Sequence, residues 1–445
     1  MNDSVKPISW RWATHPAFLF GLFVLVVLML LLAFWFFQIM KVDSLLEDLR
    51  RQGFPTNGEE LNASYVVPTG VTDSTAEWTR ALHAAEAACT SKAAGKLPFV
   101  GNGSDPAPRG KPWAELEAAR KFMDDHAADR QLILDAAALG GQVRFPADYR
   151  AGWDTLLPEI NSSRAISRLM ALDASVTAYD GNSPRVLEDV RAIFSFSLAL
   201  HDEPVLISQL VRSAIFATGA ITTEQVLPDT NWTGADLAAL QKLLQTAQFR
   251  KDYAHAMIGE RALFQADIMP QFPIPPLRPL VQQQVFHVYG QTLAALAVSW
   301  KEGLKRSEEL DREMGSSTPA RLPLVKFFVR QFAGSNLSTY LEAGMRSEAR
   351  LRTLNALLAV KRFQLQHQTN PQSLEQIEPE LIGPAEQVQT LLTDPFNDLP
   401  LLYKMDPDRI IIYSVGRNLI DDGGDVEAIK ASSQAEDVGV HLRIQ

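Results

Sequence analysis

Three aspartates and one asparagine lie close together in YSVGRNLIDDGGD, residues 413–425. Their oxygens, together with backbone carbonyls freed by Gly423 and Gly424, are the kinds of ligand that calcium takes, about six to eight at a time. The spacing differs from that of an EF-hand, because the alternating aspartates and the terminal glutamate are missing. The sequence predicts a calcium site here, and a solvated acidic turn is the alternative that these residues leave open. The predicted ligands are Asn418, Asp421, Asp422 and Asp425.

Two further polar groups could carry chemistry. In HDEP, residues 201–204, three consecutive ionisable side chains point in different directions, so we expect a turn between helices with solvated charges. Glu260 and Arg261 stand among apolar residues of a helical pattern, which favours a buried ion pair over a substrate-binding arginine. Cys89, the single cysteine, lacks the context of a catalytic thiol and is expected to be a small buried residue.

The rest of the sequence carries no familiar catalytic motif. A zincin motif, a Walker loop, a dinucleotide fingerprint and a nucleophile elbow are all missing. Lysine and arginine number 42 against 52 aspartates and glutamates, which gives a net charge of −10. A nucleic-acid-binding protein needs a basic face, so we expect no nucleic-acid partner. Calcium is the one cofactor that the sequence predicts.

The N-terminal region predicts a membrane anchor. Ala17–Phe37 contains no charged residue, and at about 1.5 Å per residue a helix of this length spans the core of a bilayer. Bulky residues follow where a signal peptidase would need small ones, so we expect an uncleaved signal anchor over 17–40, after an N-terminal segment 1–16. This helix is the expected contact with membrane lipid. Lysines and arginines are nearly balanced on its two sides, so charge alone does not fix its orientation.

Beyond the anchor, the pattern predicts a mainly α protein in three parts. Residues 41–112, with a short helix, read as a juxtamembrane spacer that ends in a segment rich in glycine and proline. Residues 113–344 have helical periodicity throughout and predict a large helical bundle or array. Within it, Thr233 with Asp236 three residues later resembles a capping box.

Residues 345–445 are expected to form a small α+β module. An amphipathic helix is followed by two strand-like runs, 400–404 and 409–415, around a tight MDPD turn. We expect Leu354 and Leu358 of the helix to pack with Ile411 and Tyr413 of the second strand.

The C-terminal module resembles the globular part of the major pseudopilin of type II secretion, as found on membrane-anchored proteins of planctomycete-type bacteria. That family has an Asp-Pro-Trp-Gly-x-Pro-Tyr segment, a Ser-x-Gly strand end and an acidic calcium loop. The resemblance covers about 85 residues and implies that Asp421, Asp422 and Asp425 belong to such a loop. Its processing motif is missing here, so we do not expect a filament subunit. The matching positions are Asp394, Pro395, Phe396, Pro400, Tyr403, Ser414 and Gly416.

Taken together, these features lead to one functional hypothesis and one alternative. The first is a single-pass protein of the cytoplasmic (inner) membrane, with residues 1–16 in the cytoplasm and its C-terminal body outside, as the resemblance implies. It would be a noncatalytic scaffold or binding protein with a calcium-stabilised tail, and an envelope or secretion-system protein is the partner that the resemblance suggests. The alternative is an anchored enzyme with a site in a cleft of the helical domain.

Overall fold

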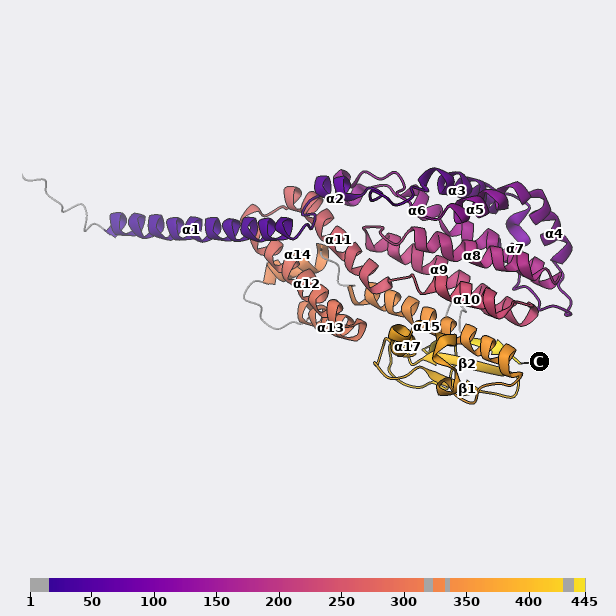
Figure 1. Cartoon of the computed structure of the whole chain (residues 1–445). Coiled ribbons are helices and arrows are strands. Elements are labelled where there is room, and N and C mark those ends of the chain that lie inside the picture. Colours follow the sequence, from indigo (N-terminus) through magenta and orange to yellow (C-terminus); the bar gives the residue numbers. More distant parts are fainter. Residues whose placement is uncertain (1–15, 316–322, 333–336, 427–435, 445) are drawn as a thin grey trace, which may run out of the picture.

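The structure, a computed structural model, describes residues 16–315, 323–332, 337–426 and 436–444. It is mainly helical, with 68% of residues in helix and 5% in strand. A long N-terminal helix projects away from a helical body, and a small sheet lies against one edge of that body (Figure 1). The predicted mainly α fold with a small C-terminal sheet is therefore confirmed.

The projecting helix is α1, Pro16–Arg51. Within the described ranges, it alone is long and apolar enough to cross a membrane, and its most apolar window has none of its surface buried by the rest of the chain. Large apolar side chains such as Phe20, Leu30 and Phe36 are exposed, which is costly in water and favourable in lipid. Past the apolar part, the helix docks on the body, where the side-chain amide of Gln283 donates to Gln38 Oε1 at 3.0 Å.

The first part of the body is a core of helices around α7. Contacts join α3 to α5 and α7, and α8 to α7. Trp78, Ala81 and Leu82 of α3 are buried in the same apolar cluster as Ile166 and Leu169 of α7. The helices are α2 Gly58–Ser64, α3 Thr75–Thr90, α4 Leu116–Asp125, α5 Ala127–Leu139, the 3-10 helix η3 Tyr149–Asp154, α6 Pro158–Ser162, α7 Arg164–Tyr179 and α8 Ser183–Ala199.

This core corrects the expectation of a spacer over 41–112. Residues 41–51 form a short helical extension of α1, and the expectation fails at α3, which is an integral part of the helical body rather than of a spacer. The physical reason is the tryptophan and alanine face of α3. Its small side chains allow close approach to α5 and α7, and that burial removes apolar surface from water. The helical body therefore begins well before residue 113.

A second core continues from the first through α8 and α9 and centres on α15. Its apolar cluster runs without a break from Val186 of α8 through Phe216 and Leu240 to Leu354 of α15. The helices are α9 Leu206–Val226, α10 Gly234–Leu244, α11 Phe249–Gln271, α12 Arg278–Val298, α13 Trp300–Gly315, α14 Pro323–Phe332 and α15 Leu337–His367. Short helices α16 Pro379–Ile382 and α17 Ala385–Leu391 and the 3-10 turns Ala94–Lys96, Leu227–Asp229, Pro275–Leu277 and Leu374–Gln376 complete the set.

The C-terminal sheet is antiparallel, with strand order β1-β2-β3. The strands are β1 Leu402–Met405, β2 Arg409–Ser414 and β3 Val438–Arg443. The two predicted strands are confirmed, and β3 was not predicted. Ile410 and Ile412 of the central strand β2 face α15 and share its apolar cluster.

Two details of the predicted module need correction. The expected partners Ile411 and Tyr413 are buried, but they lie on the opposite face of β2, because successive side chains of a strand point to opposite sides. Their neighbour is the acidic loop, since a Cβ on Gly424 would stand 3.1 Å from the Tyr413 ring and 3.2 Å from Ile411. The expected boundary between 344 and 345 falls inside α15, so the sheet and the helical body share one helix and one core.

Candidate functional site

A polar cleft opens where the C-terminal halves of α5 and α8 meet the first turns of α11. Its volume is about 750 Å³, within the range of roughly 300–1,000 Å³ that is usual for small-molecule sites. The side chains that bring chemistry to it come from the 140–142 loop, α8, the 201–204 turn and α11. They are Gln142, Arg191, Ser195, His201, Asp202, Lys251, Asp252 and His255.

His201 is held at the cleft wall in a defined orientation. Its Nδ1 lies 3.0 Å from the carbonyl of Leu198 and therefore carries a hydrogen. Its Nε2 then accepts from the side-chain amide of Gln142 at 3.1 Å. Asp202 Oδ2 lies 3.4 Å from the same Nε2 and 3.1 Å from Nη2 of Arg144. A protonated His201 would thus find a carboxylate beside it.

Asp252 is the buried acid of the cleft, and its carboxylate pairs with the buried arginine Arg212. The side chain of Arg212 is fully buried, and its Nη1 donates to Asp252 Oδ2 at 2.7 Å. Arg212 also donates from Nε to the Ser197 carbonyl at 2.9 Å and stacks over the Phe249 ring. Burial raises the pKa of Asp252, and the arginine opposes that rise. The pair fixes α11 against α8 and α9.

The charge that remains unpaired at the cleft is positive. Asp202 and Asp252 each face an arginine, whereas Arg191 and Lys251 are exposed and form no ion pair with any residue that the structure describes. His255 also opens onto the cleft, and desolvation by the surrounding protein lowers its pKa, which favours the neutral imidazole. The cleft therefore offers cationic and neutral hydrogen-bonding groups to a polar ligand, with two imidazoles available for proton transfer.

The expectation of solvated charges over residues 201–204 is wrong for Glu203. Its side chain is fully buried and accepts a hydrogen bond from the hydroxyl of Tyr65. Burial raises the pKa of Glu203 to about 7 against the opposing effect of that hydrogen bond. Tyr65 in turn packs edge-to-face on Tyr149 at 5.1 Å. The burial of Glu203 comes from contacts with residues distant in the sequence, such as Tyr65, which the tetrapeptide alone does not signal.

The predicted ion pair between Glu260 and Arg261 does not form. Glu260 Oε1 accepts from the backbone N–H of Leu206 at 3.0 Å. The guanidinium of Arg261 lies over the Phe54 and Phe286 rings instead, at 5.9 and 5.8 Å. Burial lowers the pKa of Arg261 to about 10. Consecutive residues of a helix point about 100° apart, which separates the two side chains.

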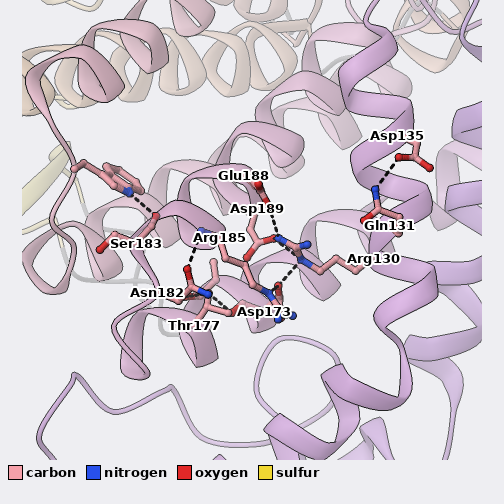
Figure 2. Close-up of polar contacts among 12 residues, drawn as sticks. Arg130, Gln131, Asp135, Asp173, Thr177, Asn182, Ser183, Arg185, Glu188 and Asp189 are labelled. Carbon is pink, nitrogen blue, oxygen red and sulfur yellow. Dashed lines mark hydrogen bonds and ion pairs between the residues drawn. The ribbon is translucent and has the colours of Figure 1, made fainter.

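A charged network inside the first core was not predicted. Figure 2 shows Arg130 of α5 reaching between Asp173 of α7 and Asp189 of α8. Arg130 Nε lies 2.6 Å from Asp173 Oδ2, and Arg185 holds both oxygens of Asp173 at 2.9 and 2.6 Å. Both aspartates are fully buried, and burial together with Asp173 raises the pKa of Asp189 well above its ordinary value. This network ties three helices together, and it lies away from the polar cleft's lining residues.

The acidic loop brings only some of its predicted ligands together. Asp421 Oδ1 accepts from the Tyr413 hydroxyl and from the Gly423 N–H, each at 2.9 Å. Asn418 donates to Asp422 Oδ2 at 2.7 Å. All three aspartates are exposed, and Asp425 contacts neither of the other two through a hydrogen bond in the described chain. The loop thus forms a turn with its own internal hydrogen bonds, from which carboxylate oxygens point to solvent.

Two residues that the sequence did not single out organise this loop. Asp437 is buried and accepts from the Gly424 N–H at 2.9 Å, and Lys404 donates to the Gly423 carbonyl at 2.9 Å. Burial, and then the nearby Asp422 and Asp421, raise the pKa of Asp437. In the described ranges, no group of three or more histidine, cysteine, aspartate or glutamate side chains is close enough to hold a metal. Residues 427–435, between the loop and Asp437, lie outside the described ranges.

The two motif segments of the C-terminal module meet at one carboxylate. Asp394 is buried, and its oxygens accept from the Phe396 N–H at 2.8 Å, the Ser414 hydroxyl at 2.7 Å and the Val415 N–H at 2.9 Å. Gly416 follows with φ 64°, and a Cβ there would stand 1.9 Å from the carbonyl of Glu436. This geometry explains why aspartate, serine and glycine are needed at these positions. They join the end of β2 to the 394–400 turn.

Comparison of the chain with protein-family models, with curated proteins and with solved structures found no match. The features of this chain that indicate a function are the cleft, the acidic loop and α1.

Proposed function

We propose that this chain is a single-pass membrane-anchored protein whose body lies outside the cytoplasmic membrane and acts as a noncatalytic scaffold or binding protein. The observation that carries the proposal is α1, a helix of 36 residues whose apolar part is exposed while its last turns dock on the body. Such a helix, with lipid around residues 17–40, would hold the polar cleft at a fixed distance from the membrane. An envelope or secretion-system protein is the proposed partner of the body.

Reporter fusions test the proposed orientation. Alkaline phosphatase fused after Gln445 should be active, and a fluorescent protein that folds only in the cytoplasm should be dark at the same position. The matched control is the same pair of fusions on a chain that lacks residues 1–40, for which the two outcomes should be exchanged. An inactive phosphatase with a bright cytoplasmic reporter on the full chain would contradict the proposal.

The proposal includes a calcium-stabilised, pseudopilin-like tail. Carboxylates that point to solvent around Asp421 and Asp422, above the buried Asp437, support it. Affinity on the order of 10⁻⁴ to 10⁻³ M is usual for extracellular calcium modules. At a hundredfold excess over the dissociation constant, binding to the folded state alone adds about 2.7 kcal/mol.

Thermal unfolding of the full chain in nonionic detergent tests the calcium site. Calcium should raise the midpoint relative to magnesium and to chelator at equal ionic strength, because a short loop does not easily give magnesium its strict octahedral geometry. Asp421→Asn and Asp422→Asn should remove the effect, and Asp408→Asn, an exposed aspartate in the β1–β2 turn, should retain it. Equal midpoints in all three solutions would mean that the loop is a solvated turn.

A second candidate function is an anchored enzyme that uses the polar cleft. The observation that favours it is the presence of His201, Asp202 and His255 around one cavity, with the His201 tautomer fixed by its neighbours. If one of these imidazoles transfers a proton, His201→Asn or His255→Asn should lower turnover by about 10²–10⁴-fold. A panel of ester and phosphoester substrates, measured with the wild type and both variants, decides between this candidate and the first.

A further inference from the structure

A second pocket, separate from the polar cleft, surrounds a single carboxylate. It has a volume of about 400 Å³ and lies between η3, the first turn of α9, α11, α12 and the start of α15. We call it the aromatic pocket. The lining residues with a part in ligand binding are Tyr149, Trp153, Leu206, Glu260, Tyr289 and Tyr340. Glu260 is the one formally charged side chain among the described residues that line it.

Close packing of two backbones places Glu260. A Cβ on Gly259 would stand 1.8 Å from the Pro204 carbonyl, so only glycine lets α11 approach the chain just before α9. This approach puts Glu260 Oε1 3.0 Å from the Leu206 N–H. The N-terminus of a helix carries partial positive charge and stabilises a carboxylate there. Burial raises the pKa of Glu260 against the opposing effect of the hydrogen bond from Leu206, and no lysine, arginine or histidine in the described chain forms an ion pair with it, so the carboxylate lacks a full counter-ion.

Aromatic rings surround this carboxylate. Tyr149 and Tyr289 are buried walls of the pocket, and Tyr340 is half-buried beside them. Tyr289 and Tyr340 line the same pocket as Glu260, and burial, and then the charge of Glu260, raise the pKa of both tyrosines.

The 3-10 helix η3 brings a fourth ring to the pocket. Gly152, with φ 63°, turns the backbone there, and the adjacent Trp153 is 50% exposed at the rim. A Cβ on Gly58 of α2 would stand 2.3 Å from the Tyr149 carbonyl, so α2 and η3 are packed backbone to backbone. Because this packing fixes the backbone of η3, it also fixes the positions of Tyr149 in the pocket wall and of Trp153 at the rim.

We propose that the aromatic pocket binds a small organic ammonium ion, with Glu260 as counter-ion and the rings of Trp153, Tyr289 and Tyr340 around the cationic group. Aromatic faces attract a cation through the ring quadrupole, and cages of this kind recognise alkylated ammonium groups. A calcium ion is disfavoured, because one carboxylate among rings does not supply about six to eight oxygens. The proposal is independent of the orientation and calcium proposals, since it concerns the helical body alone.

Choline is the probe, and 3,3-dimethylbutan-1-ol, its uncharged carbon counterpart, is the matched control ligand. Isothermal titration of the full chain in nonionic detergent should show choline binding at least about tenfold more tightly than the alcohol, which has the same shape but no charge. Equal affinities, or no choline binding at about 10⁻² M, would overturn the proposal.

Variants assign the binding to this pocket. Glu260→Gln should weaken choline binding by about tenfold or more, and Trp153→Ala should weaken it by about three- to thirtyfold. Trp153 is half exposed, so its loss should leave the fold intact even if Glu260→Gln destabilises α9. Glu59→Gln, an exposed glutamate on α2, is the matched control and should bind as the wild type. Unchanged choline affinity in Trp153→Ala and Glu260→Gln would place the ligand elsewhere and refute the assignment.

Discussion

At the scale of single residues, the buried charges differ in how their neighbours satisfy them. Asp173 accepts hydrogen bonds from Arg130 and from both nitrogens of the Arg185 fork, whereas Asp189 faces Arg130 and the carboxylate of Asp173 (Figure 2). Because burial and Asp173 raise the pKa of Asp189 well above its ordinary value, that carboxyl retains a proton more readily. Two aspartates of equal burial therefore have different electrostatic roles.

This difference predicts unequal costs for two isosteric substitutions. Asp173→Asn leaves two arginines without their shared carboxylate and should lower the free energy of unfolding by about 3 kcal/mol or more. Asp189→Asn replaces a readily protonated carboxyl by an amide of the same shape and should cost about 1 kcal/mol. Urea denaturation of the two variants and the wild type measures both values. Equal losses would contradict this difference between the two aspartates.

Glu203 predicts a pH dependence of stability. Its folded pKa of about 7 lies above the ordinary value of 4.5, so the folded state binds the proton more tightly than the unfolded state does. The corresponding stability is fully present below pH 4.5 and is lost as the pH rises through 7. A shift of this size corresponds to about 3 kcal/mol.

The measurement compares urea unfolding at about pH 5 and about pH 8. The wild type should lose more stability between these two pH values than Glu203→Gln, by up to about 3 kcal/mol. Taking the difference between the two proteins removes the contributions of the other buried acids. Glu59→Gln should behave as the wild type. A wild type and a Glu203→Gln variant with the same pH dependence would mean that Glu203 is already ionised at the lower pH.

At the scale of elements, periodic and capped segments were predictable. The Thr233–Asp236 capping box is present, and the two strands around the MDPD turn form. Each of these follows from local sequence. The third strand β3 also has a strand-like pattern in the sequence, because the apolar residues Val438, Val440 and Leu442 occupy every second position and are the buried ones. A segment of six residues is weak evidence by itself.

Features that depend on tertiary contacts were not predictable. Glu203 is buried against Tyr65, 138 residues away in the sequence, and Glu260 pairs with a helix N-terminus because Gly259 allows close approach. The polar cleft joins side chains more than a hundred residues apart, such as Gln142 and His255. Patterns in the sequence do not show which distant residues come close together in the fold. The four acidic-loop residues could be singled out only because they are close together in the sequence.

Replacing either of two glycines in neighbouring helices by alanine should change the stability of the chain, in opposite directions. Gly259→Ala places a methyl group 1.8 Å from the Pro204 carbonyl, so α11 must move, at a cost of about 1–3 kcal/mol or more. Gly290 of α12 is exposed, and a methyl group added there would have no heavy atom within 4 Å, so Gly290→Ala should stabilise the chain by about 0.4–1 kcal/mol. Thermal unfolding in detergent compares them, and two shifts of the same sign would contradict the packing argument.

At the scale of the whole molecule, α15 joins the helical body to the sheet. One side of it packs on α9, α10, α11 and α13, and another covers β2 and β3. The same apolar cluster includes Leu357 of α15, Phe216 of α9 and Ile412 of β2. Contacts of this kind make the two parts mutually dependent, because separating them would expose apolar surface on both sides of α15.

A chain that lacks residues 1–40 should therefore unfold in one cooperative transition. Of the deleted residues that the structure describes, 16–37 are exposed and only the end of the segment, at Gln38, contacts the body, so the deletion removes little packing and yields a protein that can be studied without detergent. Far-ultraviolet circular dichroism reports mainly on the helices, and the tryptophans lie in the helical body, so a tail-specific probe is needed as well. Cys89 replaced by alanine and a fluorophore attached at Asp408→Cys, in the β1–β2 turn, supply it. The unfolding transitions reported by circular dichroism, by the tryptophans and by the attached fluorophore should coincide in urea.

Truncation after His367 should lower the urea midpoint of the helical signal. It should also expose an apolar face that binds dye, because Leu354 and Leu358 lose the cover of β2 and β3. A tail probe that unfolds at lower urea than the helices, with the truncated chain as stable as its parent, would instead make the sheet an independent domain.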